Sequence, residues 1–496
     1  MNPSPGIAEL VRQIYPDPRA KRCLDELPRL LEQFRDRLQP PDDRGEVNAA
    51  AGLDQADAII IARADQFSGS DAAPLAYLHR FLREDLDGYA TGVHIPGLTP
   101  PLSDDQRSLI DYRQVSAELG SWQDIAAIAA DFQLMVDLLE LNYQEPALLI
   151  EMLAVVLLSA LHGARLIRFD STAYYWTEPA AGRAHHPHAR QIVALVRAVI
   201  EEVAPWVVIA SETDEAHLVC NHALAPLTLD ACIRRDSVRL QQWAANLRHP
   251  TNKRAFCNLL GSSDGIGVLP PEILSDAERA NLVQTVESRG GRVSRHGIAE
   301  GDAPWELNTT WYSAVADPNL PDDQRTRIFM VSQSIMLCMA GVPAVHINSL
   351  IGTVNCSEDD RTIKRRALDY RQLVQELNDS HSQRHRVFEG YRQLLRARAQ
   401  SAAFHPAARQ DILETPQQVF AVLRTNQQQQ SSVLCLHNLS GEAVDVSVTR
   451  RYLSSTDERS FRDLISGDYF FPHWNAAGNA EITLDAYEVM WLRLAT

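Results

Sequence analysis

RLIRFD, residues 165–170, is a largely apolar run that ends in a carboxylate. Runs of the same form are WVVIASE at 206–212 and AFCNLLGSSD at 255–264. Continuous rather than alternating apolar runs are expected where strands are parallel and both faces of the sheet are buried. Each of these runs therefore predicts a buried parallel strand with a polar residue at its carboxyl end.

Five more runs bring the candidate strands to eight, and helix-like segments such as 149–162 and 189–203 lie between them. Alternating strands and helices over residues 56–409 predict a TIM (β/α)8 barrel. A doubly wound open sheet has the same periodicity, so this alternative stays open on periodicity alone. The other five runs are ADAIIIAR (56–63), TGVHI (91–95), LMVDLL (134–139), HALAPLTL (222–229) and GVPAVHI (341–347).

The N-terminal part of the chain differs from this pattern. Residues 6–40 have apolar positions at helical spacing, interrupted by Pro16 and Pro18, and predict a pair of helices. A polar, turn-rich linker follows at 40–55. We therefore expect an N-terminal helical segment with its linker at 1–55, before the barrel begins.

The C-terminal part is expected to be a separate β-domain at 410–496. It has short apolar runs with no helical pattern between them, which predicts an antiparallel β-sandwich. The low-complexity tract NQQQQSS, 426–432, falls between two of these runs and is interpreted as a hairpin loop. The expected strands are QVFAVLRT (418–425), SVLCLHNLS (432–440), EAVDVSVT (442–449) and AYEVMWLRL (486–494).

Charge and composition exclude several classes of partner. The chain has 496 residues, with 47 Lys and Arg against 64 Asp and Glu, a net charge of −17. Such a charge repels nucleic acids unless a basic face is segregated, and the basic residues are scattered. We find no secretory signal and no stretch that could span a bilayer, and the seven cysteines lack a C-x-x-C pair. We expect a cytoplasmic protein with reduced thiols and no membrane or nucleic-acid partner.

Three of the predicted strands end in carboxylates, namely Asp170, Glu212 and Asp264. In a barrel the carboxyl ends of the strands meet at one face, where catalytic residues lie. Retaining transfer of a glycosyl group needs a nucleophile and an acid about 5 Å apart, but solvated loops also collect carboxylates. The three residues are therefore candidates for glycoside chemistry, and solvated loop charge stays open as the alternative.

The sequences around these carboxylates resemble those of sucrose phosphorylases and related enzymes of the α-amylase clan. RLIRFDSTAYYW (165–176) resembles the fourth-strand motif, in which an Arg two residues before a nucleophilic Asp contacts the sugar site. VVIASET (207–213) is similar to the fifth-strand segment with the acid/base Glu, and LLGSSDGIGV (259–268) to the segment with an Asp that stabilises the transition state. The order and spacing of the three motifs match together, which makes the resemblance specific.

Further segments extend the resemblance over nearly the whole chain. DDRTIKRRALD (359–369) resembles a segment whose Arg, together with an Asp after the second strand, holds the distal hydroxyls of a glucosyl unit. The matching residues here are Arg361 and Asp104. Three other matching segments are 94–125 (second barrel loop), 214–229 (sixth strand) and 341–353 (eighth strand and following loop).

The resemblance implies a retaining α-glucosyl-transferring enzyme that acts on a small α-glucoside, with inorganic phosphate as a possible acceptor. Asp170 would attack the anomeric carbon, Glu212 would act as acid and then as base, and Asp264 would stabilise the transition state. Arg168 would orient Asp170, although a structural ion pair is the alternative for it. The resemblance implies neither an organic cofactor nor a required metal.

The chain also departs from the family pattern. In the family an Asn-His pair and a long insertion domain follow the third strand, whereas here residues 136–152 lead straight into the next helix. The residue before the stabilising Asp is normally His, and here it is Ser263. Donor and acceptor binding are therefore expected to be altered, and a non-catalytic relative that binds a sugar or a protein partner stays open as the second hypothesis.

Three smaller signals have alternative interpretations. Residues 261–265 satisfy the G-x-S-x-G pattern of an esterase, but the two prolines that follow do not suit the helix which that motif requires. His185, His186 and His188 suggest a metal, although a loop and helix start is the expected structure. An open barrel mouth without the insertion could be covered by a second subunit, so we expect a homo-oligomer.

Overall fold

The computed structural model of the chain describes residues 3–40, 52–98, 113–138, 141–170, 172, 175–176, 186–248, 254–262, 265–268, 273–295, 304–356, 367–426, 428, 431–453 and 460–494. Residues 41–51, which make up most of the expected linker, lie outside this set.

Eight parallel strands of the described residues close into a barrel in the order β1-β12-β8-β7-β6-β5-β4-β3. The predicted TIM barrel is therefore confirmed, and the doubly wound alternative is wrong. Seven of the eight predicted runs overlap a barrel strand. The strands are β1 (Ile59–Ile61), β3 (Gly92–His94), β4 (Gln133–Leu138), β5 (Ala164–Phe169), β6 (Val208–Ser211), β7 (Leu218–Asn221), β8 (Ala255–Asn258) and β12 (Val342–His346).

The prediction of the sixth barrel strand at 222–229 is wrong. That strand is β7, Leu218–Asn221, and the apolar run after it forms most of helix α7, Leu224–Arg234. Pro226 explains the error, since it lies in the first helical turn, where the backbone N–H has no partner in the helix and proline is tolerated. An apolar run of this length cannot be assigned to a strand or a buried helix by periodicity alone.

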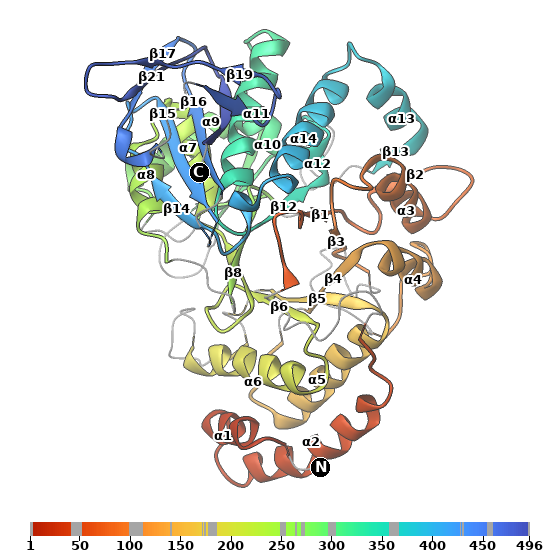
Figure 1. Cartoon of the computed structure of the whole chain (residues 1–496). Helices are drawn as coiled ribbons and strands as arrows, with labels where there is room; N and C mark the ends of the chain where they lie inside the picture. The colour runs from red at the N-terminus through yellow and green to blue at the C-terminus, as the bar shows by residue number, and fades with distance from the viewer. Residues whose placement is uncertain are drawn as a thin grey trace.

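Helices surround the barrel, and the pair at the N-terminus packs on the outside of this layer (Figure 1). Helix α5 is apolar on almost every face, because the barrel covers one side and the N-terminal helix α2 covers part of the other, while α1 packs on α6. The predicted helical segments 149–162 and 189–203 correspond to α5 and α6. The helices are α1 (Pro5–Ile14), α2 (Arg19–Arg35), α3 (Pro74–Asp85), α4 (Trp122–Asp131), α5 (Pro146–Leu161), α6 (Pro187–Val203), α8 (Val238–Ala245), α9 (Asp276–Ser288), α10 (Trp311–Val315), α11 (Asp322–Cys338), α12 (Ile347–Leu350), α13 (Tyr370–Asn378) and α14 (Gln383–Ala399).

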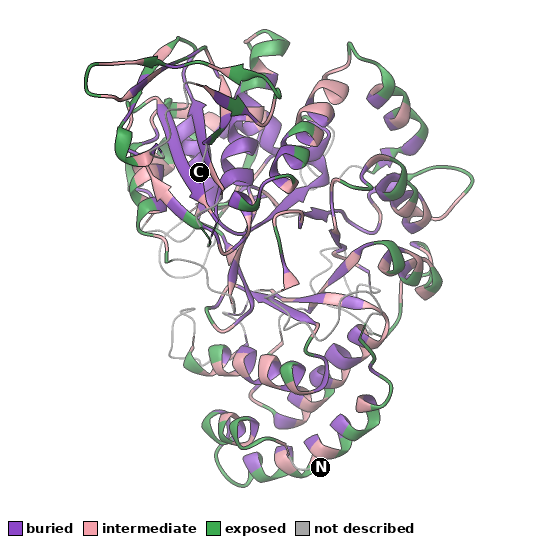
Figure 2. Ribbon diagram, viewed as in Figure 1, coloured by how far each residue is buried: buried purple, intermediate pink, exposed green. Residues whose placement is uncertain are grey.

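Side chains that point into the barrel form a packed interior and then become polar toward its carboxyl end. Because side chains alternate along a strand, every second residue points inward. On β5 the inward residues after Leu166 are Arg168 and Asp170, and on β6 Glu212 follows Ala210 in the same way. Figure 2 shows the buried strands inside helices whose outer faces are exposed. The apolar interior thus supports a polar layer at the barrel mouth.

The C-terminal part forms two antiparallel sheets that enclose a core of their own, as predicted. The tract at 426–432 joins two neighbouring antiparallel strands, which agrees with the predicted hairpin. The six-stranded sheet contains β14 (Arg409–Ile412), β15 (Val419–Thr425), β16 (Ser432–Asn438), β22 (Val489–Leu494), β18 (Phe461–Asp463) and β19 (Tyr469–Phe470), and the three-stranded sheet contains β17 (Val444–Val448), β21 (Ala480–Leu484) and β20 (His473–Trp474). Shorter pairings outside these sheets are β2 (Phe67–Ser68) with β13 (Leu368–Asp369), and β11 (Pro304–Asn308) with β9 (Ile266–Gly267) and β10 (Arg292–Arg295).

Buried polar contacts join this β-domain to the barrel. The fully buried guanidinium of Arg424 donates to the Cys338 carbonyl at the end of α11 (2.7 Å) and to the His405 carbonyl (2.9 Å). His437 on β16 hydrogen bonds with Ser334 of α11, which also accepts from the Trp491 indole, each at 3.0 Å. The two parts therefore share an interface that is both apolar and polar.

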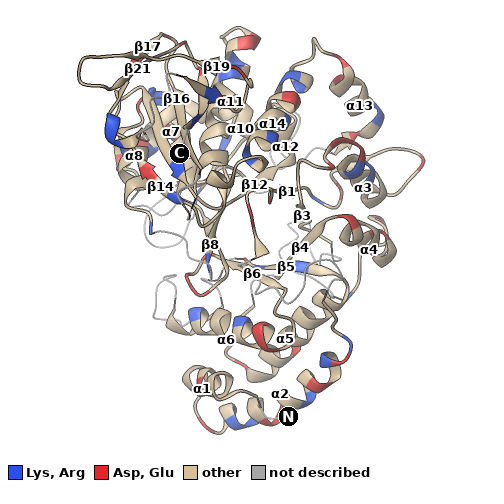
Figure 3. Cartoon of the chain, viewed as in Figure 1, with Lys and Arg blue, Asp and Glu red and all other residues tan. Residues whose placement is uncertain are grey.

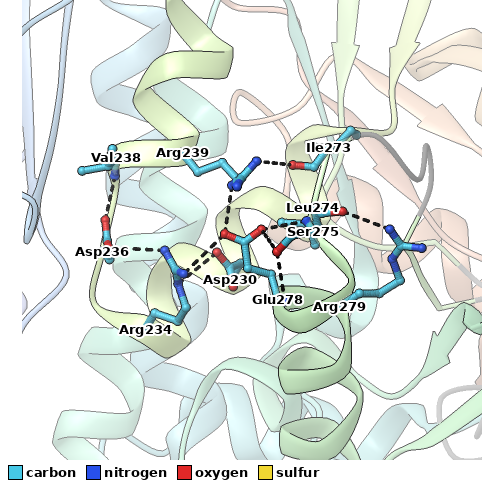
Figure 4. A network of polar contacts seen from close by, with 10 residues as sticks. All are labelled: Asp230, Arg234, Asp236, Val238, Arg239, Ile273, Leu274, Ser275, Glu278 and Arg279. Carbon is cyan, nitrogen blue, oxygen red and sulfur yellow. Dashed lines mark hydrogen bonds and ion pairs between the residues drawn. The ribbon is translucent and has the colours of Figure 1, made fainter.

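Charged residues of both signs are interspersed over the helices, as Figure 3 shows. One network joins α7, α8 and α9, where Glu278 caps α9 and accepts from Arg239 at 2.9 Å (Figure 4). Arg234 contacts Glu278 at 3.4 Å and Asp230 at 3.2 Å. Burial raises the pKa of Asp230 to about 6, although Arg234 opposes this shift. Among the described helices, none is long and apolar enough to cross a membrane.

Candidate active site

Two of the predicted site residues, Arg168 and Asp170, meet at the carboxyl end of β5. Arg168 Nη2 donates to Asp170 Oδ1 at 2.5 Å, and its Nη1 lies 3.6 Å from Asp137 Oδ1 on β4. The Arg168 side chain is 18% exposed and that of Asp170 is 24% exposed. The guanidinium is thus held between two carboxylates, while Asp170 still reaches the mouth of the barrel.

A histidine on the next strand extends this chain of charges. His94 Nε2, at the end of β3, hydrogen bonds with Asp137 Oδ1 at 2.7 Å, and the imidazole is almost fully buried. Burial alone would raise the pKa of Asp137, but His94 and Arg168 outweigh it and hold the pKa below its ordinary value. Asp137 is therefore an ionised partner for the Arg168 guanidinium and also contacts the His94 imidazole, and the four side chains form one continuous network.

Glu212 follows β6 and lies beside Asp170. Phe169 and Ser211 are paired in register, so the two carboxylates leave neighbouring strands at the same level. Neighbouring strands lie about 4.8 Å apart, which is close to the 5–5.5 Å between the two carboxyl groups of retaining glycosidases. Thr172 Oγ1 donates to Glu212 Oε2 at 3.3 Å. The backbone therefore places Asp170 and Glu212 as a pair at the mouth.

His222, the first residue after β7, approaches Glu212 from the other side. Its Nε2 lies 3.6 Å from Glu212 Oε1, and 43% of its side chain is exposed. The protein around the ring removes part of its water and so lowers the pKa of His222, but Cys220 and Glu212 outweigh this effect and raise it above the ordinary value. Glu212 thus has a hydroxyl on one oxygen and an imidazole near the other.

The remaining predicted site residues, Asp104, Ser263, Asp264 and Arg361, lie outside the described residues. The residues on either side of 263–264 are described. Backbone hydrogen bonds join Ser262 and Gly265 in both directions, at 3.0 and 3.3 Å, and strand β9 begins at Ile266. A nucleophile elbow must lead into a helix, so the strand after Gly265 argues against the esterase interpretation.

The histidine-rich segment before α6 forms a helix start, as predicted. His186 is the N-cap of α6, and its Nδ1 accepts from the His188 backbone N–H at 3.2 Å. Trp176 stacks on the His186 ring. His185 lies outside the described residues, and among those that are described no group of three or more His, Cys, Asp or Glu is placed to hold a metal ion.

The connection between β4 and α5 is short. β4 ends at Leu138 and α5 begins at Pro146, so this connection cannot contain a domain. In most TIM barrels such loops build the walls of the active site. Nothing between these two elements is long enough to form a wall over Asp170 and Glu212.

Four contributors to this site were missed from the sequence: His94, Asp137, Thr172 and His222. The first two lie within the apolar runs TGVHI and LMVDLL at inward positions, so alternation along each strand, counted from its buried residues, could have identified them. His222 was missed because it was assigned to the start of the predicted strand 222–229, whereas it follows the end of β7. Thr172 has no comparable signal in the sequence.

Comparisons with known proteins support this architecture. The chain is 35% identical to the glucosylglycerate phosphorylase of Spirochaeta thermophila over 581 aligned positions, which cover 99% of both chains. It is 30% identical to the glucosylglycerate phosphorylase of Allomeiothermus silvanus, over 84% of this chain and 89% of that one. Residues 416–492 match the C-terminal immunoglobulin-like domain of D-apionate lactonase.

Solved structures share the fold at low sequence identity. Sucrose 6F-phosphate phosphorylase from Thermoanaerobacter thermosaccharolyticum matches with a TM-score of 0.65 and 14% identity, over 87% of this chain and 98% of that one. An α-amylase from H. orenii matches with the same TM-score and identity, over 89% and 99%. These structures establish the common architecture of a barrel followed by a β-domain.

Proposed function

The chain belongs to the glucosylglycerate phosphorylase family of the α-amylase clan, and from this premise we propose that it transfers an α-glucosyl group with retention through a covalent glucosyl-enzyme. The observation that carries the proposal is the pairing of Asp170 and Glu212 on neighbouring strands, with Arg168 bound to Asp170. Such a pair of carboxylates, one with a cationic partner, suits a nucleophile and an acid/base.

In the first step Asp170 attacks the anomeric carbon of the donor, and the bond from that carbon to the leaving oxygen breaks. Glu212 gives its proton to the leaving oxygen, so the products are a glucosyl ester of Asp170 and a free alcohol. In the second step an acceptor attacks the same carbon while Glu212 takes a proton from the acceptor. The ester bond breaks and Asp170 is released, and the two inversions give net retention.

The network behind Asp170 prepares it for attack. Arg168 fixes one oxygen of the Asp170 carboxylate, and Asp137 in turn fixes the guanidinium. His94 closes the network from β3. Side chains held in this way need little reorganisation as charge moves in the transition state.

The substrate class follows from the relatives. A small α-glucoside such as glucosylglycerate is the proposed donor, and inorganic phosphate is the proposed acceptor. By resemblance, Asp264 stabilises the transition state, Asp104 and Arg361 hold the distal hydroxyls of the glucosyl unit, and Ser263 lines the donor site. These four roles are proposals for residues outside the described set.

A shortened barrel loop modifies this function. The alignment with the Spirochaeta relative has 581 positions and this chain has 496 residues, so the relative has segments with no counterpart here. The short β4–α5 connection agrees with a lost insertion at this place. A more open mouth admits water, so hydrolysis and transfer to other acceptors are expected to compete with phosphorolysis.

The second candidate is a non-catalytic relative that binds sugar or a protein partner. Ser263, where the family has His, and the short β4–α5 connection favour it. The test is incubation with α-glucosyl fluoride, with and without phosphate. Because fluoride leaves with little help from an acid, the assay reports on Asp170 alone.

We expect fluoride release that is abolished in Asp170→Asn and kept in the matched surface variant Asp445→Asn. No release from the wild-type protein, or equal release from wild type and Asp170→Asn, would favour the non-catalytic candidate.

A further inference from the structure

His222 occupies an unusual place for a histidine at this site. It follows Leu218 and Cys220 at the inward positions of β7, so its ring points into the mouth of the barrel. Almost half of the side chain is exposed, and Nε2 lies 3.6 Å from the carboxylate of Glu212. A reactant that exchanges a proton with Glu212 therefore comes within reach of His222.

The surroundings of His222 favour its protonated form. Glu212 faces it from β6, and Cys220 on its own strand hydrogen bonds with the ring. Arg168 on β5 opposes the charge, and Cys257 on β8 is paired in register with Cys220. The balance of these groups leaves the pKa of His222 above its ordinary value. These groups therefore favour the protonated form of the ring over the neutral form.

An anionic acceptor needs such a cation. During the second step phosphate must approach the anomeric carbon beside the Glu212 carboxylate, and the two negative charges repel each other. Arg168 is already engaged by Asp137 and Asp170. A protonated imidazole beside Glu212 can donate Nε2–H to a phosphate oxygen in a charge-assisted hydrogen bond.

We propose that His222 is the binding residue for the anionic group of the acceptor and of the leaving group, such as phosphate or the carboxylate of glycerate. The inference rests on the proposed glucosyl transfer and deepens it by naming the charge of its partners. His222 distinguishes anionic acceptors from water, which gains nothing from a cation at this position. His222 thereby offsets part of the preference for phosphate over water that a more open barrel mouth loses.

The test measures how the glucosyl-enzyme is divided between two acceptors, phosphate and water. With α-glucosyl fluoride as donor and inorganic phosphate at a fixed concentration, the ratio of glucose 1-phosphate to glucose depends only on the second step. His222→Gln, which removes the charge, should lower this ratio about ten- to a hundredfold, because a hydrogen bond to a charged group is lost. His222→Lys, which keeps a positive charge, should restore a large part of the ratio.

A pH series on the wild-type protein provides a readout that a merely structural residue would not change. With glycerate as acceptor, whose carboxylate stays ionised throughout, transfer relative to hydrolysis should fall as the pH rises through the pKa of His222. The His222→Gln variant should lack this dependence. A ratio that is the same in wild type and His222→Gln at every pH overturns the inference.

The failure of the proposed function has a different signature. If the wild-type protein releases no fluoride, the glucosyl transfer is wrong, and the binding of inorganic phosphate to the resting protein then decides the role of His222. Phosphate should bind at least tenfold more weakly to His222→Gln, as measured by calorimetry, and should raise the pKa of the His222 imidazole, as followed by NMR. Equal affinities overturn the inference in this case too.

Discussion

Replacing Arg168 with Met should distinguish the contribution of the network of His94, Asp137, Arg168 and Asp170 to catalysis from its contribution to stability. The substitution removes the 2.5 Å contact with Asp170 and the 3.6 Å contact with Asp137. A hydrogen bond to a charged group is worth about 1.5–3 kcal/mol, and a buried charge left without its partner costs about 3–5 kcal/mol. Because the guanidinium keeps some access to water, we expect a loss of about 2–4 kcal/mol in transition-state stabilisation.

This loss corresponds to a decrease of about 30- to 1000-fold in kcat/KM for α-glucosyl fluoride. The second variant, Arg168→Met/Asp137→Asn, also removes the charge of the carboxylate that the first leaves without its guanidinium partner. It should recover much of the stability to urea lost in Arg168→Met but little of the activity, since Asp170 still lacks its partner. Together with the wild-type protein and the single variant Asp137→Asn, these two variants form a double-mutant cycle.

The control is Arg168→Lys, which keeps the charge but not the forked geometry and should fall between the other variants in activity. If Arg168→Met keeps kcat/KM within about threefold of wild type, Arg168 does not orient the nucleophile and the proposed mechanism loses its main support. If the double variant recovers activity together with stability, the network is structural only.

Four further predictions concern catalysis and stability. Glu212→Gln should slow turnover of glucosylglycerate about a hundredfold more than turnover of α-glucosyl fluoride, because only the former needs a proton on its leaving oxygen; equal losses in steady-state rates would contradict the acid role. Asp230→Asn should stabilise the protein to urea by about 3 kcal/mol at pH 8, because the folded-state pKa of about 6 lies above the unfolded value, and the gain should vanish below about pH 4. His217 is buried with a pKa lowered to about 4, chiefly by burial, so wild-type stability should lose a contribution of about 3 kcal/mol as the pH falls from 6.5 to 4. His217→Asn should lack this contribution. The prediction would be refuted if the free energy of unfolding in urea depended on pH in the same way in the two proteins. Arg424→Met leaves buried carbonyls unpaired and should destabilise the chain by about 3–5 kcal/mol in a thermal melt, whereas Arg409→Met on the exposed edge should have little effect.

Much of the fold could be predicted because its strands are continuous apolar runs separated by helices. The error at 222–229 shows the limit of this approach. LVCN, 218–221, is only four residues long, and the longer apolar run after it is a helix that begins near Pro226. The shorter run forms the strand because the barrel closes through it. Closure depends on all eight strands together, so no local sequence pattern reveals it.

The part of the site that could be predicted consists of the carboxylates that follow the ends of predicted strands. Asp170 and Glu212 could be placed at the barrel mouth on this basis, and the register of β5 and β6 adds that they are direct neighbours. The contact between His222 and Glu212 was beyond reach, because it depends on the level at which β7 ends relative to β6. Contacts between side chains on neighbouring strands depend on the register of those strands, which cannot be derived from a single sequence.

The junction between Arg424 on β15 and the end of α11 affects how this protein can be divided or recombined. Removing the chain after residue 409 would expose the Cys338 carbonyl and the apolar surface of α11 to solvent, and it would take away the ring of His437 from Ser334. A barrel expressed alone should therefore aggregate, and a chimera with the β-domain of a relative should fold only if that domain supplies an equivalent buried arginine. The barrel and its β-domain are therefore expected to be inherited together in this family. Recombination between relatives should preserve the residues at their junction more strictly than the loops at the barrel mouth.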